Sequence, residues 1–237
     1  MGPAGPAGPA GLTRYRAELV PWLWMLSLSS DCRTFGSATA LDVATHVFRG
    51  AGYSAFQTKV TAKLPAYDYL AQYQETNLAF VSRLLEAAGL YYTFEHGPKG
   101  HTLVVSDAVG SAVPCGLKTP VDIAPAASAA GAWPDVVTAV TREYAVHTRS
   151  VALGDTQLLR RDSAGTSNSA EPTAKGERYT FLGVGPEGLG SYATDARLRI
   201  EAEEAGGDVV SDTSTCNAFA VGTRIKLGRS GTPGGGR

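Results

Sequence analysis

Residues 73–96 constrain the fold more than any other part of the chain, because a strand, a capped helix and a second strand follow one another there. Thr76 or Asn77 can cap the first turn of the helix, and Gly89 can close the last. Beyond Gly89 the hydrophobic period drops to two, which is typical of a strand. The helix has one apolar and one polar face. The apolar face carries Leu78, Val81, Leu84, Leu85 and Ala88, and the polar face carries Asn77, Ser82, Arg83 and Glu86.

Short motifs in and around this run carry a family resemblance. They are Tyr-x-Glu-Thr-Asn at 73–77, Phe-x-x-Arg-Leu-x-Glu at 80–86 and Gly-x-Tyr-Tyr-x-Phe-x-His at 89–96. The segments 15–24 and 196–203 fit the same pattern. In these motifs the chain resembles VgrG, the spike protein of bacterial type VI secretion systems, and through it the baseplate hub proteins of contractile-tailed phages. The resemblance covers roughly residues 13 to 228 and is weakest between 108 and 180.

The resemblance implies a fold and a mechanical role. The expected fold is α+β, mainly β, made of phage baseplate hub-like domains with a split barrel and packed helices. The expected role is that of a structural, non-enzymatic tip protein. Such a protein forms a homotrimer when complete, docks on the tube protein and carries effectors or tip proteins. A phage or prophage tail baseplate hub protein is the alternative within the same class.

Composition fits this reading and excludes other partners. With 21 Lys plus Arg against 22 Asp plus Glu, the net charge of -1 gives no electrostatic case for nucleic acid or an anionic membrane. The longest apolar stretch, 19–28, is interrupted by Pro21 and Ser27 and is too short to span a bilayer. No secretory signal peptide is recognised at the N-terminus. We therefore expect a protein that is cytoplasmic during assembly and is then exported to the extracellular space or a target cell without such a peptide.

Composition shifts along the chain predict its organisation. Three Gly-Pro-Ala triplets in residues 1–12 form a linker or scar, too short for a collagen helix. An α+β hub domain follows at 13–108, then an Ala/Pro/Gly/Ser-rich linker at 109–134, a second barrel-like hub domain at 135–228 and a flexible tail at 229–237. Relatives in the family carry a barrel upstream and a needle downstream. We therefore expect a truncated frame or a cut fragment with at most one complete barrel.

In the first half, helical and alternating patterns predict specific elements. Thr39 and Asp42 have capping-box spacing, and Gly50 and Gly52 end that helix. The turn at 97–100 joins two strands as a hairpin. The expected elements are a strand at 15–20, a helix at 39–49, and strands at 56–61, 70–74, 90–95 and 101–106.

In the second half the signals are weaker. Alternation over 136–153 predicts a long or bent strand pair, and the polar stretch 160–175 predicts a loop. We expect a strand at 177–182, a helix at 192–205 and one or two strands at 213–227.

One motif suggests an enzyme. Gly183, Gly185 and Gly188 make a formal G-x-G-x-x-G after a predicted strand and before a predicted helix, which would cradle a pyrophosphate. Three facts oppose a nucleotide-dependent enzyme. The helix should begin inside the motif, but Gly190 extends the flexible stretch and the helical pattern starts only near residue 192. The preceding strand is too polar for the centre of a doubly wound sheet, and too few residues follow the motif to form the rest of a nucleotide-binding sheet. A second glycine-rich run, ending at Gly116, Lys118 and Thr119, has Leu117 where a phosphate loop needs its Lys. Both runs are interpreted as plain loops.

The remaining reactive side chains predict no catalytic, cofactor or metal site. His96 and His101 flank the expected hairpin turn, but no third ligand joins them. Three further groups receive structural interpretations. Cys32, Cys115 and Cys216 are ordinary core or surface thiols. A solvated helix face carries Glu201, Glu203 and Glu204, with Arg197 paired to Glu201. Core or interface packing, in place of a sugar or nucleobase platform, is expected for Trp22, Trp24, Tyr73, Tyr91 and Tyr92.

Overall fold

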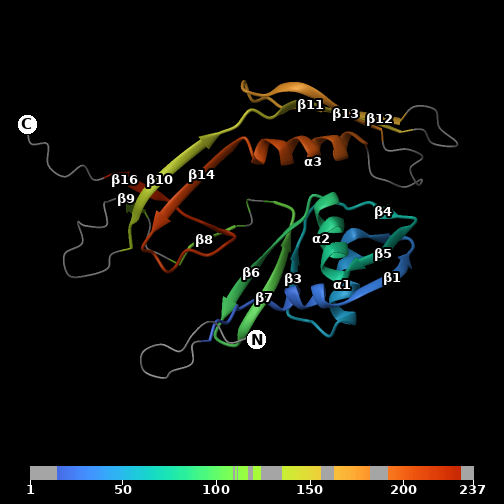
Figure 1. Ribbon diagram of the computed structural model, residues 1–237, viewed down its shortest axis with the longest axis horizontal. Coiled ribbons are helices and arrows are strands. Elements are labelled where there is room, and N and C mark those ends of the chain that lie inside the picture. Colours follow the sequence, from blue (N-terminus) through green and yellow to red (C-terminus); the bar gives the residue numbers. More distant parts are fainter. Residues whose placement is uncertain are drawn as a thin grey trace, which may run out of the picture.

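The computed structural model describes residues 15–108, 110, 112–116, 120–123, 135–155, 163–181 and 192–230. Figure 1 shows two parts, one with α1, α2 and the strands β1 to β7 and one with α3 and the later strands, in which the long pair β10 and β14 runs from α3 and β11 to β9 and β16. The first part comprises η1 (Trp22–Leu28), β1 (Ser30–Phe35), β2 (Ala38–Thr39), α1 (Ala40–Gly50), β3 (Phe56–Lys59), β4 (Ala66–Tyr67), β5 (Leu70–Thr76), α2 (Asn77–Ala87), β6 (Tyr91–Gly97) and β7 (Gly100–Ser106).

The second part has more strand and one helix. It comprises β8 (Val113–Pro114), β9 (Val121–Ile123), β10 (Val137–Tyr144), β11 (Thr148–Asp155), β12 (Ser163–Asn168), β13 (Lys175–Phe181), α3 (Tyr192–Ala205), β14 (Asp208–Ser214), β15 (Thr223–Arg224) and β16 (Leu227–Ser230). With mostly strands and few helices, the expected α+β, mainly β class is confirmed.

Both helices of the first part begin and end where the sequence predicts. The Thr39 hydroxyl accepts from the Asp42 amide at 3.1 Å and the Asp42 carboxylate accepts from the Thr39 amide at 3.1 Å, which completes the capping box of α1. Thr76 caps α2 by accepting from the Ala79 amide at 3.1 Å. Gly89, at φ +69°, ends α2 in the left-handed conformation that glycine adopts without strain.

The core of the first part lies between these helices and a three-stranded sheet. That sheet has the order β3-β7-β6, and the predicted hairpin is confirmed by the pairing of Gly97 with Gly100. Phe80, which the helical pattern left off the apolar face, is fully buried on α2, whereas Leu78 is only partly buried. The side chains buried here include Leu26, Val43, Val47, Phe48, Phe80, Val81, Leu84, Leu85, Leu103 and Val105.

A buried polar network joins β1, β5 and the start of α2. Gln72, 2% exposed, accepts from the Arg33 guanidinium at 2.8 Å and donates to the Asn77 carboxamide oxygen at 3.0 Å. Arg33 also donates to the same Asn77 oxygen at 2.9 Å. Because a buried amide costs free energy unless it is hydrogen-bonded, this network fixes the register of β5 against β1.

The second part is built on two larger sheets and the short parallel pair β8–β15. In the sheet β12-β11-β13, β11 pairs antiparallel with β12 and parallel with β13, and α3 packs against it. Its buried residues are Val151, Leu153, Tyr192, Ala196 and Ile200. The other sheet has the order β14-β10-β9-β16. The segment 109–134 thus supplies β8 and β9, and β16 continues past residue 228.

Three sequence-based expectations were wrong. Residues 15–20 are not a strand, because no strand of the described chain lies beside them to complete a ladder. Residues 163–168 of the expected loop form β12, a polar strand that exists through its pairing with β11. The expected strand pair at 136–153 is β10 followed by β11, which belong to different sheets and do not pair with each other.

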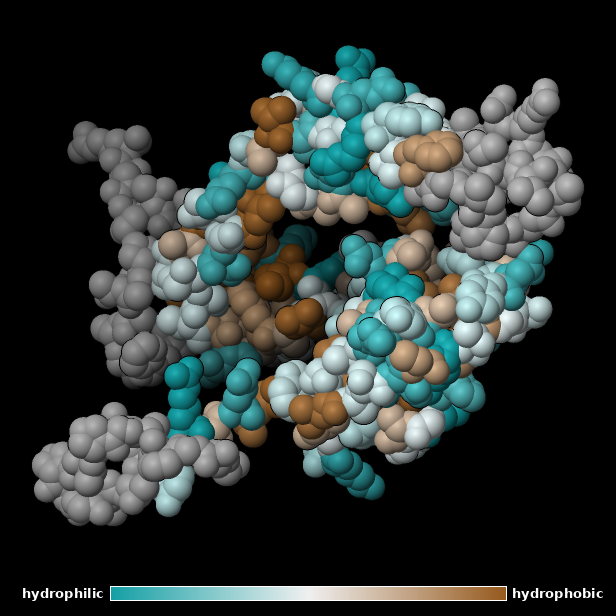
Figure 2. Space-filling view, turned by 45° about the vertical axis from the view of Figure 1, so that its right-hand side comes forward, coloured by the Kyte–Doolittle hydropathy of each residue, from teal (hydrophilic) through white to brown (hydrophobic). Residues whose placement is uncertain are grey.

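The two parts meet where α3 passes the end of α2. A Cβ added to Gly89 would lie 2.5 Å from a methyl carbon of Leu198, so the helices approach closely there. Beside this contact lies a cleft of about 470 Å³, lined by α3, by Gly89 and by the loop before β4. Figure 2 shows the molecule hollowed between the part that carries α3 and the part that carries α1 and α2.

Candidate assembly surface

The free half of the β10–β14 pair is exposed on both faces. Residues 139–144 of β10 and 208–213 of β14 are all exposed, although the two strands are hydrogen-bonded to each other along this length. Beyond Val137, β10 has no second neighbour among the described strands. A two-stranded ribbon with nothing on either face is marginal by itself. We call residues 139–144 and 208–213 the ribbon surface.

Large apolar side chains stand on the ribbon surface. Val140, Tyr144, Val209 and Val210 are 40%, 67%, 40% and 55% exposed. Val140, Tyr144 and Val210 share a face, because Val140 lies opposite Asp212, Tyr144 opposite Asp208 and Val210 opposite Arg142. Contiguous exposed apolar groups of this kind mark contact sites with other chains.

An ion pair holds the end of the ribbon surface. The Arg142 guanidinium donates to Asp208 at 2.7 Å and makes a second contact with its other oxygen, and Arg142 also lies 4.9 Å over the ring of Tyr144. The hydrogen bond from Arg142 lowers the pKa of Asp208 and raises the pKa of Arg142. Because the ion pair is open to solvent, it contributes little to the free energy of folding. Its main effect is to orient the Tyr144 side chain.

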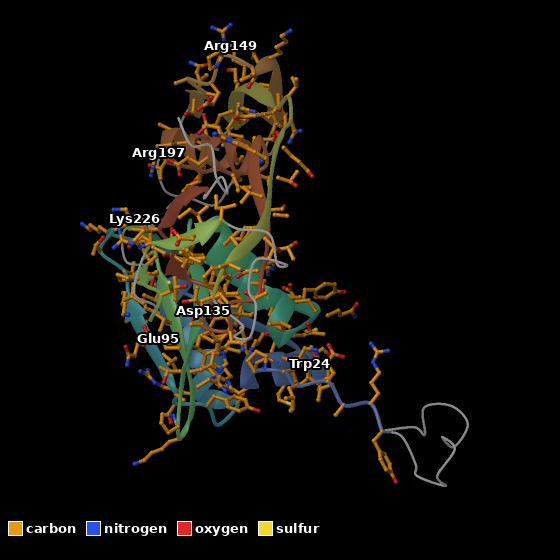
Figure 3. All side chains as sticks on the ribbon, turned by 90° about the vertical axis from the view of Figure 1, so that its left-hand side faces the viewer. Trp24, Glu95, Asp135, Arg149, Arg197 and Lys226 are labelled. Carbon is orange, nitrogen blue, oxygen red and sulfur yellow. The ribbon has the colours of Figure 1, made fainter. Side chains whose placement is uncertain are left out.

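Two further apolar patches lie on the surface. Tyr179 and Phe181, on the edge strand β13, are 64% and 59% exposed and point to the same side. On the first part, Trp24, Met25 and Leu28 project from η1. Figure 3 shows Trp24 at the side of the first part, far from Arg149 at the outer end of the second.

The histidines and cysteines expected to have structural roles form no metal site. His96 and His101 are paired across the β6–β7 hairpin with ring centroids 5.8 Å apart. Within the described residues, no group of three or more His, Cys, Asp or Glu side chains can hold a metal ion. Cys32 is exposed, Cys115 is buried and Cys216 is intermediate, and each is a free thiol.

The two glycine-rich runs are only partly described. The loop 183–188, on which the nucleotide hypothesis rests, lies outside the described residues. Of the phosphate-loop-like run, Gly116 is described and exposed, whereas Lys118 and Thr119 lie outside.

The acidic residues of α3 divide between two roles. Arg197 pairs with Glu201 at 2.7 Å, as the spacing predicts. Glu203 is not simply solvated, because it contacts Arg178 of β13 and accepts from the Thr148 hydroxyl at 3.4 Å. It therefore ties α3 to its sheet.

The aromatic residues also divide. The Trp22 ring stacks on Tyr53 at 4.6 Å and packs edge-on against Phe48 at 5.3 Å, as core packing requires. Tyr73 is 73% exposed and lies apart from Trp22.

The cleft between α2 and α3 contains two perturbed carboxyl groups. Hydrogen bonds from Ala62 and Thr61 lower the pKa of Asp107. Burial raises the pKa of Asp195, and burial together with the Asp195 charge raises the pKa of Tyr67. Perturbed groups in a cleft are a feature of acid–base sites. The described lining holds no His, Cys or Ser, and its hydroxyl and amine groups are those of Thr61, Thr194, Tyr67 and Lys63.

The ribbon surface is what sequence reasoning missed. Alternation predicted a strand at β10 but not that both of its faces are uncovered. The available signal was that neither alternating set of β10 is consistently apolar, since Arg142 and Glu143 fall on opposite faces. The adjacent Val209 and Val210 of β14 likewise point to opposite faces.

Comparison with known proteins identifies the class. The sequence profile of the phage tail baseplate hub (GPD) family matches residues 4–234. The chain therefore belongs to the phage tail baseplate hub family. No helix in the described residues is long and apolar enough to cross a membrane.

Within this family, the chain is similar to a secretion spike protein. It is 44% identical over 97 residues to the type VI secretion system spike protein VgrG1c of Pseudomonas aeruginosa, a match that covers 41% of this chain and 13% of VgrG1c. The chain thus spans a small part of the length of that relative.

Two solved structures share the fold. One is the E. coli c3393 protein, a component of the type VI secretion system with structural similarity to the T4 bacteriophage tail proteins gp27 and gp5. It has a TM-score of 0.57 at 17% identity, and the match covers 86% of this chain and 43% of that one. The other is the 43 kDa tail protein of prophage MuSo2 from Shewanella oneidensis. Its TM-score is 0.52 at 15% identity, with 86% and 61% of the two chains covered.

Proposed function

We propose that this chain is part of the puncturing spike of a type VI secretion system. In this role it forms a homotrimer with the rest of the spike, docks on the contractile tube and helps to deliver effectors. The observation that carries the proposal is the 44% identity over 97 residues to a type VI spike protein.

The exposed strands give this role a physical basis. The ribbon surface and the edge strand β13 present apolar side chains and backbone groups without a partner in the described chain. Such edges are covered in stable proteins, because open ones promote aggregation. Copies related by three-fold symmetry would cover them in a closed assembly.

A tail baseplate hub of a phage or prophage is the second candidate. The similarity of fold to the MuSo2 tail protein favours it. Both candidates predict a trimer. They differ in the assembly that contains the chain, which is a type VI secretion system in one case and a phage tail in the other.

The experiment that tests the proposal and separates the two candidates is a chimera. The matching segment of VgrG1c is replaced with this chain and expressed in Pseudomonas aeruginosa lacking its own VgrG1c. Export of the chimera into the medium, dependent on the secretion apparatus, is the expected result. A well-folded chimera retained in the cells would favour the phage candidate.

We also propose that the chain has no catalytic role and that it leaves the cytoplasm through the secretion machine, without a signal peptide. The rival is a nucleotide-dependent enzyme that uses the loop 183–188. A nucleotide at 100 times its dissociation constant would raise the free energy of unfolding by about 2.7 kcal/mol. We expect thermal unfolding of the purified chain to be unchanged by ATP or NAD, and a clear upward shift would return weight to the enzyme.

A further inference from the structure

A histidine caps the first turn of η1. The backbone N–H of Trp22 donates to Nε2 of His101, 79 residues away on β7, at 3.0 Å. Pro21, the residue before η1, gives this turn no side-chain cap. The imidazole of His101 therefore supplies the acceptor that a capping side chain would otherwise provide.

Few other polar contacts hold this turn. The Nε1 of Trp22 is buried and has no hydrogen-bond partner among the described residues. The Trp22 ring is held by packing on Tyr53 and Phe48. Leu23 and Leu26 anchor the rest of η1 in the core at 2% and 1% exposed, whereas Leu19, upstream of the turn, is 96% exposed. The Trp22–His101 bond is thus the polar link between the incoming chain and the core.

This bond exists in only one protonation state of His101. Nε2 can accept a hydrogen bond only when the ring is neutral and carries its proton on Nδ1. A protonated ring has two donors and no acceptor, so the Trp22 N–H would face another N–H. Imidazole gains its proton between about pH 8 and pH 5. Because the docked turn excludes a proton that the released turn can bind, docking is complete at higher pH and is lost as the pH falls.

The groups that face His101 are few. The His96 ring centroid lies 5.8 Å away across the hairpin, and Lys99 lines the same cleft. Glu95 also lines this cleft, but it is opposite Thr102 in the hairpin and pairs with Lys59 at 2.8 Å. Phe94 meets the His101 ring edge-on at 5.5 Å. The η1 segment carries no titratable side chain, and Tyr53 touches it through Trp22.

We propose that His101 is a proton-sensitive latch that holds the first turn of η1, at Trp22, on the core of the first part at neutral pH and releases this turn in acid. The latch is independent of the spike assignment, since it depends only on contacts within this chain.

Tryptophan emission tests the latch. Replacing Trp24 and Trp133 with Phe leaves Trp22 as the only tryptophan of the chain's three. Lowering the pH from about 8 to about 5 should move the Trp22 emission maximum to longer wavelength, as the ring leaves Tyr53 and Phe48. In H101Q, whose amide oxygen accepts at every pH, this shift should vanish. In the matched control H96Q it should persist. An equal shift in H101Q, or none in the parent, overturns the proposal.

A measurement on the parent protein decides the matter even if H101Q does not fold. With nitrogen-15 in its histidines, NMR at about pH 8 reports which ring nitrogen of His101 carries the proton. The latch requires the proton on Nδ1, and protonation of Nε2 over the same pH range as the emission shift. A neutral His101 with its proton on Nε2 would rule the latch out.

Discussion

At the scale of single residues, Gly89 is the position where local conformation and tertiary contact coincide. It has φ +69°, and an added Cβ would lie 2.5 Å from Leu198. Gly52 has φ +86° and nothing within 4 Å of an added Cβ. A substitution at Gly52 therefore measures the free-energy cost of the left-handed backbone without a steric clash.

We expect Gly52→Ala to lower the free energy of unfolding by about 1 to 2 kcal/mol, from the left-handed backbone alone. Gly89→Ala should cost more, because Leu198 must also move. Urea denaturation measures both. The additional loss of unfolding free energy in Gly89→Ala, relative to Gly52→Ala, should shrink when Gly89→Ala is combined with Leu198→Ala. Equal losses for the two glycine variants would contradict the close approach of α2 and α3.

Glu75 gives a pH dependence of stability with a defined sign. Its carboxylate receives hydrogen bonds from the Arg83 guanidinium at 2.9 Å and 3.0 Å, and these lower the pKa of Glu75. A lowered folded-state pKa means that the contribution is present above the ordinary glutamate range and is lost as pH falls through it.

The free energy of unfolding should therefore decline between about pH 5 and pH 3 less steeply in Glu75→Gln than in the parent. Denaturation curves at several pH values measure the slope. Glu86→Gln, on the exposed side of α2, the helix that carries Arg83, is the control and should leave the slope unchanged. If Glu75→Gln and the parent gave parallel curves, Glu75 would have no part in acid stability.

At the scale of elements, α2 tests the division between buried and solvated faces. Leu84 is 4% exposed and Glu86 is exposed. Leu84→Ala should lower the free energy of unfolding by about 2 to 5 kcal/mol, and Glu86→Ala should change it by about 0.5 kcal/mol or less. Equilibrium denaturation with equal losses for the two variants would reject the core role of α2.

The ribbon surface predicts an effect on assembly without an effect on folding. Val210 is 55% exposed, so Val210→Lys should change the free energy of unfolding by about 0.5 kcal/mol or less. In the VgrG1c chimera the same change should weaken the trimer, since it places a charge on an apolar contact. Sedimentation velocity measures both. Tyr69→Lys, at a residue 59% exposed on the first part, is the matched control and should leave the trimer intact.

Helices and caps could be predicted from the sequence because their signals are local. The Thr39–Asp42 capping box follows from spacing alone, and α3 has the bounds that the sequence predicts. A strand forms only beside a partner strand, and the local sequence does not show which segment that partner is. β12 is polar and exists through β11, whereas residues 15–20 have strand-like alternation and no partner in the described chain. The ribbon surface was missed for the same reason, since exposure depends on what packs above a strand.

At the scale of the whole molecule, the described buried residues include two separate clusters, and the division into two domains stays a prediction. One is centred on α1 and α2 and the other on α3 with β11. The boundary at 109–134 stays a prediction, because that segment also supplies β8 and β9 to the later strands. Large exposed apolar groups lie in both parts.

The most direct test of the spike assignment is the mass of the VgrG1c chimera in solution. Multi-angle light scattering at tens of micromolar should give the mass of three chains, and the isolated chain should be monomeric or poorly soluble. A folded chimera with the mass of one chain would contradict the spike assignment.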